Sequence, residues 1–481
     1  MNMKTWWHAV LFIAALCCFV LGGAAVAGAA SAPELSCQIG STKYATIPDA
    51  LVAVPDNTAT TIKLLKACAV SGSCTLKNKN ITFDLNGYNL VFSNSTNDNP
   101  ALYLIKCTIK TTGSGLLGVT TTAGWNLALY AEDSNLMLNG NIKATGEGDC
   151  AVSVWNTHLT LTGSVTASGA GCTSLNAGDS SVVTITGNIT ASGGVPTSGG
   201  DASVGICTGG PGVKVTVAGS VTADGMAIEN GNGYGDDQYA TIHVTGNVTS
   251  RAGNGVVIYY YGTVTIDKSL SANKAYIIIN GSGKKLTTAQ SASSTTKAGY
   301  KTFTDGKNTV WVKEVNVYFY NGSSVTKRSV ACGAKATAPS VKKTGYALAG
   351  WYTTKAKTGG TKFDATKAVT KSVTYYARWK STDTTLKALK VSVGKSSVFA
   401  NKTQLSNHSL SVGTTASSVA ITPTKTNSYA KVQIYNGKSW VAASSKTLSM
   451  AKGKTYYVYI RIVAENGNVG KTYTVKVSRK K

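Results

Sequence analysis

The sequence has little proline, little charge and few of the residues that build long helices. Of its 481 residues, 8 are proline and 14% are charged, whereas 51 are glycine. This composition excludes a collagen-like chain and a proline-rich linker protein, and it favours tightly turning β-structure. Serine, threonine, valine and glycine take the place of the leucine, alanine and glutamate of a helical bundle. Because 43% of the residues are hydrophobic, wholesale disorder is excluded as well.

Acidic residues are almost missing from one part of the chain. Residues 301–481 hold 31 Lys and Arg against 5 Asp and Glu, a net charge of +26. Residues 1–300 hold 16 of each sign and are neutral overall. We therefore expect the two parts to have different roles, with an anionic partner for the basic part.

The first residues carry the signals of export. Lys4 precedes a long uncharged apolar run, and Ala25-Val26-Ala27 fits a cleavage site for small residues. We predict a secretory signal peptide over 1–29. An uncleaved signal anchor is the alternative, because the run approaches spanning length, and membrane contact is expected only through such an anchor. Either way the rest of the chain is expected to be extracellular, in the cell envelope or secreted.

Eight cysteines follow the signal segment, but none forms a CxxC pair or has histidine partners at metal-ligand spacing. This pattern disfavours zinc and favours disulfides in an exported protein. Cys68 and Cys74 bracket a short turn. Cys150 and Cys172 occupy near-equivalent positions of neighbouring repeats, where a disulfide and a stack of free thiols are both consistent with the spacing.

A short pattern of alternating apolar residues around a glycine or lysine recurs between residues 138 and 272, at spacings of 22 to 32 residues. Such a period is typical of a solenoid, and the β-branched alternation indicates strands and turns. We predict a parallel β-helix over 33–300. The copies are LNGNIKA (138–144), LTGSVTA (161–167), ITGNITA (185–191), VAGSVTA (217–223), VTGNVTS (244–250) and IDKSLSA (266–272).

The start of this region supports the same fold. The segments YATIPDALVAV (44–54) and ITFDLNGYNLVF (81–92) resemble the opening of pectate-lyase-like right-handed parallel β-helix domains of exported bacterial proteins. The resemblance implies that residues 45–54 form a helix that caps the open end of the solenoid.

Many proteins of that fold cleave acidic polysaccharides, which requires clustered carboxylates and often a basic residue. Residues 33–300 contain one arginine, Arg251, and lack the Asp-Asp and Gly-His-Gly motifs of the hydrolases. His158 and His243 lie in alternating strand patterns, where a structural role is expected. We therefore expect no catalytic residue, metal or cofactor, and keep a β-helix lyase or glycoside hydrolase as the alternative.

Two groups of residues are candidate ligand contacts. Asp236 and Asp237 lie in a Gly/Asn-rich inserted loop, where calcium binding and a solvated turn are both plausible. Tyr259 and Tyr261 share one face of a strand and are suited to stack on sugar rings, although burial between coils explains them equally well.

After an expected linker at 301–313, residues 314–380 contain the segments TGYALAGWYTT (344–354) and VTYYARW (373–379). Their order resembles the Listeria–Bacteroides repeat, the B-repeat of internalin-type surface proteins, which implies a β-grasp-like fold. Cys332 replaces the usual aromatic residue. The matching residues, expected in the core and turns, are Pro339, Gly345, Tyr346, Gly350, Trp351, Tyr352, Tyr376 and Trp379.

Residues 384–481 open with LKALKVSVG (386–394) and close with YYVYIRIVAENGNVGKTYTVKVSRK (456–480). These strands resemble a cadherin-like β-sandwich of bacterial surface proteins, which implies a spacer or binding platform. The all-β chain is thus expected to be an envelope-associated adhesion or structural protein. Its expected partner is an anionic wall polymer, or a host or matrix glycan or protein, and not nucleic acid. Solubility alone is the other explanation of the basic charge.

Overall fold

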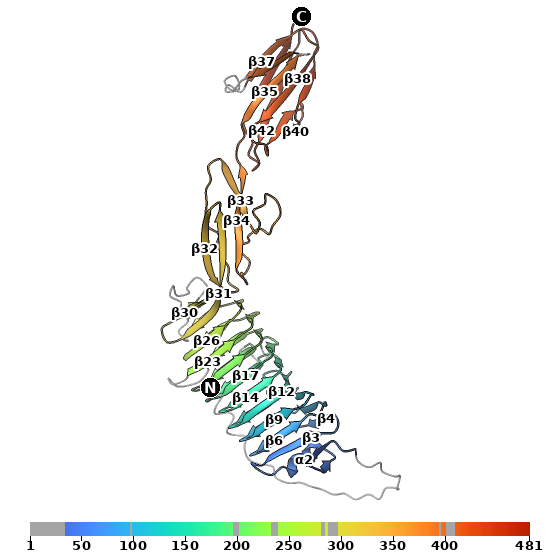
Figure 1. The fold of residues 1–481 in the computed structure, drawn as a ribbon, viewed down its shortest axis with the longest axis vertical. Helices are drawn as coiled ribbons and strands as arrows, with labels where there is room; N and C mark the ends of the chain where they lie inside the picture. The colour runs from blue at the N-terminus through green and yellow to red at the C-terminus, as the bar shows by residue number, and fades with distance from the viewer. Residues whose placement is uncertain are drawn as a thin grey trace, which may run out of the picture.

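The computed structural model forms an elongated rod of three β units in series (Figure 1). It describes residues 34–96, 99–195, 202–231, 239–279, 297–393 and 411–481, together with the backbone of 284–286, 396–400 and 409–410. Within these ranges no helix is long and apolar enough to cross a membrane. The segment expected to be a signal peptide, residues 1–29, lies outside them.

The first unit is a parallel β-solenoid of about nine turns, which confirms the predicted β-helix. Each turn contributes strands to three parallel sheets, named here sheets A, B and C. Inward-facing side chains of successive turns lie in register, as with Leu136, Leu159 and Val183, and form continuous buried columns. Sheet A contains β1 (Cys37–Ile39), β2 (Thr42–Tyr44), β3 (Ala59–Leu64), β6 (Asn80–Asp84), β9 (Thr108–Thr112), β12 (Asn135–Ala144), β14 (His158–Thr162), β17 (Val182–Ile185), β20 (Lys214–Val217), β23 (Tyr239–Val244), β26 (Tyr261–Ile266) and the start of β31 (Thr309–Asn321).

The other two sheets close each turn. Strand β12 is long enough to bend from sheet A into sheet B. Sheet B otherwise contains β4 (Cys68–Ser71), β7 (Leu90–Asn94), β10 (Leu117–Thr121), β15 (Val165–Ser168), β18 (Ile189–Ser192), β21 (Val221–Ala223), β24 (Val248–Ser250) and β27 (Leu270–Ala272). Sheet C contains β5 (Cys74–Lys77), β8 (Leu102–Ile105), β11 (Leu127–Glu132), β13 (Cys150–Trp155), β16 (Thr173–Gly178), β19 (Val204–Gly209), β22 (Met226–Asn230), β25 (Val256–Ile258), β28 (Ile277–Ile279) and β29 (Lys284–Leu286).

A short helix covers the first turn, as predicted. Helix α2 (Ile47–Ala53) begins after Thr46, whose hydroxyl accepts a hydrogen bond from the backbone N–H of Asp49 at 3.2 Å. This contact satisfies one of the free donors at the start of a helix. Ile47 and Leu51 are buried against the solenoid core, so the helix shields an edge that would otherwise expose apolar side chains.

The repeat glycines and the residues after them stack at the corner between sheets A and B. A Cβ atom on Gly163 would lie 1.7 Å from the carbonyl oxygen of Gly140, so only glycine fits this approach of neighbouring turns. Each following side chain accepts a hydrogen bond from the backbone N–H of its equivalent in the next turn, at 2.8 to 3.2 Å. This corner ladder alternates Asn141, Ser164, Asn188, Ser220, Asn247 and Ser269.

Residues 301–313 are not the linker that the sequence led us to expect. Strand β30 (Tyr300–Thr304) pairs antiparallel with β31, and β31 pairs parallel with β26 as one more strand of sheet A. Phe303 and Val310 are fully buried in the solenoid core. The Ser/Thr/Lys composition of this segment is typical of a linker, and the alternating pattern of 309–312 continues into the next domain without a break. The sequence therefore did not indicate a strand of the solenoid here.

Strand β31 is shared by the solenoid and the second unit. Its later residues pair antiparallel with β32 (Ser324–Ala331) and parallel with β34 (Val373–Ser381), and β34 pairs antiparallel with β33 (Tyr346–Tyr352). The resulting sheet has the order β32–β31–β34–β33. Because one strand runs through both units, the junction between them is a hydrogen-bonded ladder.

The third unit is a sandwich of two sheets around a core that includes Val391, Ile421 and Ile460. One sheet has the order β36 (Ser396–Ala400), β35 (Leu386–Val393), β38 (Ser418–Lys425) and β41 (Lys446–Ser449). The other has the order β37 (Ser409–Thr414), β43 (Tyr473–Arg479), β42 (Thr455–Val463), β39 (Lys431–Tyr435) and β40 (Trp440–Ala442).

Candidate functional site

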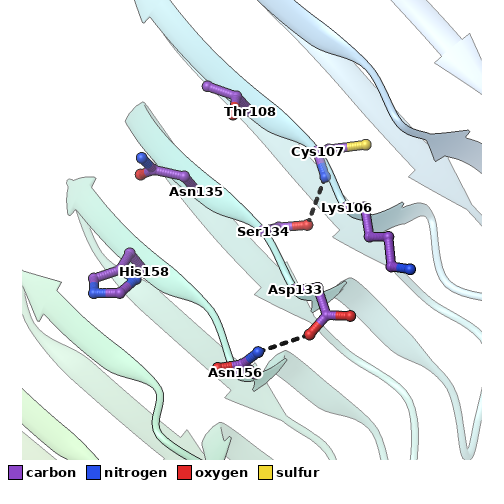
Figure 2. A pocket seen from close by; sticks show the side chains of 8 residues that line it. All are labelled: Lys106, Cys107, Thr108, Asp133, Ser134, Asn135, Asn156 and His158. Atoms are coloured by element: carbon purple, nitrogen blue, oxygen red, sulfur yellow. Dashed lines mark hydrogen bonds between the residues drawn. The ribbon is translucent and has the colours of Figure 1, made fainter. Parts of the chain in front are cut away.

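A shallow polar hollow of about 460 Å³ lies on the solenoid, at the corner where sheet C turns into sheet A (Figure 2). Three successive turns build it, and Lys106, Asp133 and Asn156 occupy the same turn position in each, with φ between 45° and 55°. Only a few residue types tolerate this left-handed conformation well, and Asn and Asp are the commonest after glycine. The full lining is Lys106, Cys107, Thr108, Asp133, Ser134, Asn135, Asn156 and His158.

Hydrogen bonds among the lining residues hold this corner together. The hydroxyl of Ser134 accepts a hydrogen bond from the N–H of Cys107 at 3.0 Å, and Asn156 donates to Asp133 at 2.8 Å (Figure 2). The same corner continues with Thr157 and Ser181, whose hydroxyls accept from the turn before them. The hollow therefore follows from the turn geometry and presents no nucleophile paired with a base.

A second polar group lies on the outer face of sheet A at the far end of the solenoid. The Nε2 of His243 lies 2.8 Å from one carboxylate oxygen of Asp267, and the hydroxyl of Tyr300 donates to the other at 2.5 Å. The ammonium groups of Lys297 and Lys313 lie 4.7 and 4.8 Å from the centre of the Tyr300 ring. Histidine, carboxylate and phenol are thus joined in one hydrogen-bonded cluster.

The chemistry of this cluster favours a structural role over proton abstraction. Burial raises the pKa of Asp267, but the hydrogen bonds from Tyr300 and His243 outweigh it and hold the pKa below its usual value. Burial, and then the hydrogen bond to this carboxylate, raise the pKa of Tyr300 to about 12. The phenol therefore keeps its proton at neutral pH and is a poor general base. The cluster ties strand β30 to the last turns of the solenoid.

The expected ligand contacts are only partly within the structure. Tyr261 begins β26, and its hydroxyl lies 3.3 Å from the Nζ of Lys307, which donates to it. Tyr259 precedes this strand and is half-buried, and its N–H donates to the carbonyl of Asn230. Asp236 and Asp237 lie outside the described residues.

The buried carboxylate of Asp149 bonds to its own turn and to the turn before it. Asp149 accepts hydrogen bonds from the backbone N–H groups of Asn126 and Gly146, at 2.9 and 2.6 Å. Burial raises its pKa despite these bonds. In the part of the chain that the structure describes, no three His, Cys, Asp or Glu side chains are placed to hold a metal ion.

The candidate disulfide cysteines are free thiols in the structure. Strand β13 pairs with β16 so that Cys150 lies opposite Thr173. Cys172 is therefore one residue out of register, and neighbouring residues of a strand point to opposite faces. Cys68 belongs to sheet B and Cys74 to sheet C, and burial raises the pKa of the Cys74 thiol to about 11.

The residues singled out in the Listeria–Bacteroides segment divide between core and surface. Trp351 is buried, with its ring 5.1 Å from that of Phe319, and the Trp379 Nε1 donates to Asn321. The centre of the Tyr352 ring lies 3.6 Å from the guanidinium carbon of Arg378. Of the others, Gly345 and Gly350 have positive φ, Pro339 is half-buried, Tyr346 is exposed, and Tyr376 packs on Tyr320.

The sequence interpretation missed the His243–Asp267 pair. Its signal was present in the repeat spacing, because Gly246 and Lys268 are equivalent positions in successive turns. That spacing places Thr265 opposite His243, and Asp267 two residues further along the same face. Tyr300 joins the pair only through the fold-back of β30, which no repeat position indicates.

Two family models match the C-terminal part of the chain. Residues 316–378 match the Listeria-Bacteroides repeat domain, and residues 381–480 match the cadherin-like beta sandwich domain. These matches confirm both resemblances, and such domains are typical of extracellular or surface proteins with adhesive or structural roles. No curated protein matches the chain.

Proposed function

We propose that the chain is an exported, non-catalytic protein of the cell envelope. The Listeria–Bacteroides repeat and the sandwich together form a stalk that holds the solenoid away from the cell surface. The basic charge of this stalk tethers the chain to that surface. The observation that carries this proposal is the series of joined β units (Figure 1). Strand β31 has 13 residues, which span about 43 Å at about 3.3 Å per residue, and pairs in both the solenoid and the repeat.

The junction between the repeat and the sandwich is also held by specific contacts. Glu465 of the sandwich accepts a hydrogen bond from the N–H of Ser381 at 3.0 Å and pairs with Lys357 of the repeat at 3.1 Å. The N–H of Asn466 donates back to the carbonyl of Ser381 at 3.2 Å. Contacts of this kind favour a stalk that keeps its direction, which a displayed module requires.

The charge of the stalk supports the tether. All of the net charge of +26 belongs to residues 301–481. Glu465 is the one acidic residue after Asp383, and it is engaged at the junction. The remaining surface of the sandwich therefore attracts polyanions over distances set by the ionic strength.

The test is co-sedimentation of the chain without residues 1–29 with bacterial cell walls across a salt series. We expect pelleting at low salt, release as salt rises, and no pelleting with walls stripped of anionic polymers. Replacing five exposed lysines of the sandwich by glutamine should weaken pelleting, and five in the solenoid should not. The first set is Lys387, Lys438, Lys452, Lys454 and Lys471, and the matched set is Lys43, Lys77, Lys106, Lys110 and Lys143.

Pelleting that depends neither on salt nor on the sandwich lysines contradicts an electrostatic tether. If the chain does not pellet at all, the basic charge serves solubility alone, and the solenoid belongs to a freely secreted protein.

A further inference from the structure

Three aromatic side chains form a row across the outer face of the second sandwich sheet. The register places Trp440 of β40 opposite Tyr435 of β39, and Ile434 opposite Ile460, which brings Tyr435 beside Tyr459 of β42. The ring centres of Tyr435 lie 5.6 Å from Trp440 and 6.4 Å from Tyr459. Tyr457, two residues before Tyr459, faces the same side, so the four residues form what we name the aromatic platform.

The sandwich core does not require the platform. The alternate residues of β42, Val458, Ile460 and Ile462, are buried and supply the core, whereas Tyr457 and Tyr459 are 54% and 38% exposed. Large aromatic groups exposed side by side on a strand face are characteristic of binding surfaces rather than of packing.

The platform is held in place before any ligand arrives. The guanidinium of Arg461 lies 4.2 Å from the centre of the Trp440 ring, and its Nε donates to the side-chain oxygen of Gln433 at 2.8 Å. A ring fixed in this way loses little conformational entropy on binding.

The charges around the platform are all positive. Lys476 of β43 lies opposite Tyr457 in the register, and Lys431 of β39 pairs with Val463 at the other end of the same sheet. Both lysines are exposed, and Arg461 lies between them. None of the strands β39, β40, β42 and β43 contains an acidic residue, and Glu465, which follows β42, is paired with Lys357.

We propose that the aromatic platform binds a polysaccharide whose sugar rings carry carboxylates. The apolar faces of the rings would stack on Tyr435, Tyr459 and Trp440, and the carboxylates would pair with Arg461 and the flanking lysines. This inference rests on the proposed tether and narrows it to one face and one class of polymer. A polyol phosphate offers charge without rings, and a neutral glycan offers rings without charge.

The test measures binding of the chain without residues 1–29 to polygalacturonate oligosaccharides by calorimetry. Fully methyl-esterified oligosaccharides serve as rings without charge, and inorganic polyphosphate serves as charge without rings. We expect at least tenfold weaker binding to the esterified form. We expect Trp440→Thr and Tyr459→Thr each to weaken polygalacturonate binding at least tenfold while leaving polyphosphate binding unchanged.

Threonine is chosen because it suits an exposed strand position. If Trp440→Thr changes the circular dichroism spectrum, Tyr459→Thr, at a position that is 38% exposed, provides the same test. Tyr88→Thr, on a solenoid turn and 39% exposed, is the matched control and should bind as the parent does. Platform variants that bind polygalacturonate normally overturn the inference, as does a parent that binds polyphosphate but not polygalacturonate.

The two proposals fail in different ways. If the platform variants still pellet with walls in a salt-dependent manner and still bind polygalacturonate, the tether stands and the platform is not its site. If the parent binds polygalacturonate through the platform but never pellets with walls, the tether falls and the platform stands.

Discussion

The solenoid and the Listeria–Bacteroides segment bury their apolar surface in opposite ways. In the solenoid, aliphatic columns such as Leu136, Leu159 and Val183 repeat turn after turn, and each side chain contributes a small share. In the Listeria–Bacteroides segment, the centre of the single Phe319 ring lies 5.1 Å from the ring centres of both Trp351 and Phe363. A small unit has little interior, so a few large rings must supply its core. Stability is therefore spread out in one region and concentrated in the other.

Trp351→Ala should have the largest effect. Truncating a buried tryptophan costs about 3–5 kcal/mol, which is most of the stability of a small domain. We expect the repeat to unfold at lower urea concentration while the solenoid keeps its transition, followed by near-ultraviolet circular dichroism. The matched control is Trp125→Ala on a solenoid turn, where the side chain is 64% exposed and the expected cost is below about 0.5 kcal/mol. Equal losses in the two variants would mean that the buried Trp351 ring contributes no more than an exposed ring, which contradicts a core concentrated in a few rings.

Gly163→Ala tests whether the solenoid tolerates an added methyl group where the backbones of two neighbouring turns approach most closely. An added Cβ would lie 1.7 Å from the Gly140 carbonyl oxygen, and the φ of Gly163 is 152°. We expect a loss of about 2–3 kcal/mol, seen as a lower melting temperature of the solenoid transition. Gly413→Ala in the sandwich is the control, because nothing lies within 4 Å of its added Cβ. A solenoid that tolerates the methyl group as well as the sandwich does would show that its corners can shift.

The parts of the fold that were predictable from the sequence depend on local spacing. The repeat spacing sets the register between turns, and the resemblance of residues 44–54 to the opening of β-helix domains located the helix before the first turn. The same spacing also carried the signal for the His243–Asp267 pair, which the sequence interpretation did not use. The parts that were not predictable depend on which strands become neighbours. Two examples are the hairpin of β30 with β31 and the row formed by Tyr435, Trp440 and Tyr459. The strands that meet in them carry no repeated sequence pattern that would indicate their pairing.

The smallest expected effect concerns the contacts between neighbouring turns and between neighbouring domains. Neutral side chains join the turns of the solenoid, whereas a charged side chain joins the Listeria–Bacteroides repeat to the sandwich. The Asn/Ser corner ladder has no group that titrates below pH 7. At the junction, burial raises the pKa of Glu465, but the hydrogen bond from Ser381 and the ion pair with Lys357 outweigh it, and the pKa lies below its ordinary 4.5. A carboxyl group with a lowered folded pKa stabilises the junction fully above about pH 4.5 and loses that contribution as the pH falls through the folded value.

We therefore expect the angle between the repeat and the sandwich to become variable as the pH falls below about 4.5 and through the folded pKa of Glu465, while the solenoid keeps its shape. Small-angle X-ray scattering across pH 7 to 3 measures this as a change in maximum dimension, with circular dichroism to verify that each unit stays folded. Glu465→Gln should show the loosened junction already at pH 7, because the ion pair with Lys357 is lost. Asp364→Asn removes another carboxylate with a lowered pKa, but its partner Thr366 lies in the same loop, so this variant should behave as the parent does. A Glu465→Gln variant that keeps the parent's dimensions at pH 7 would mean that backbone contacts such as Asn466 to Ser381 hold the junction without the charge.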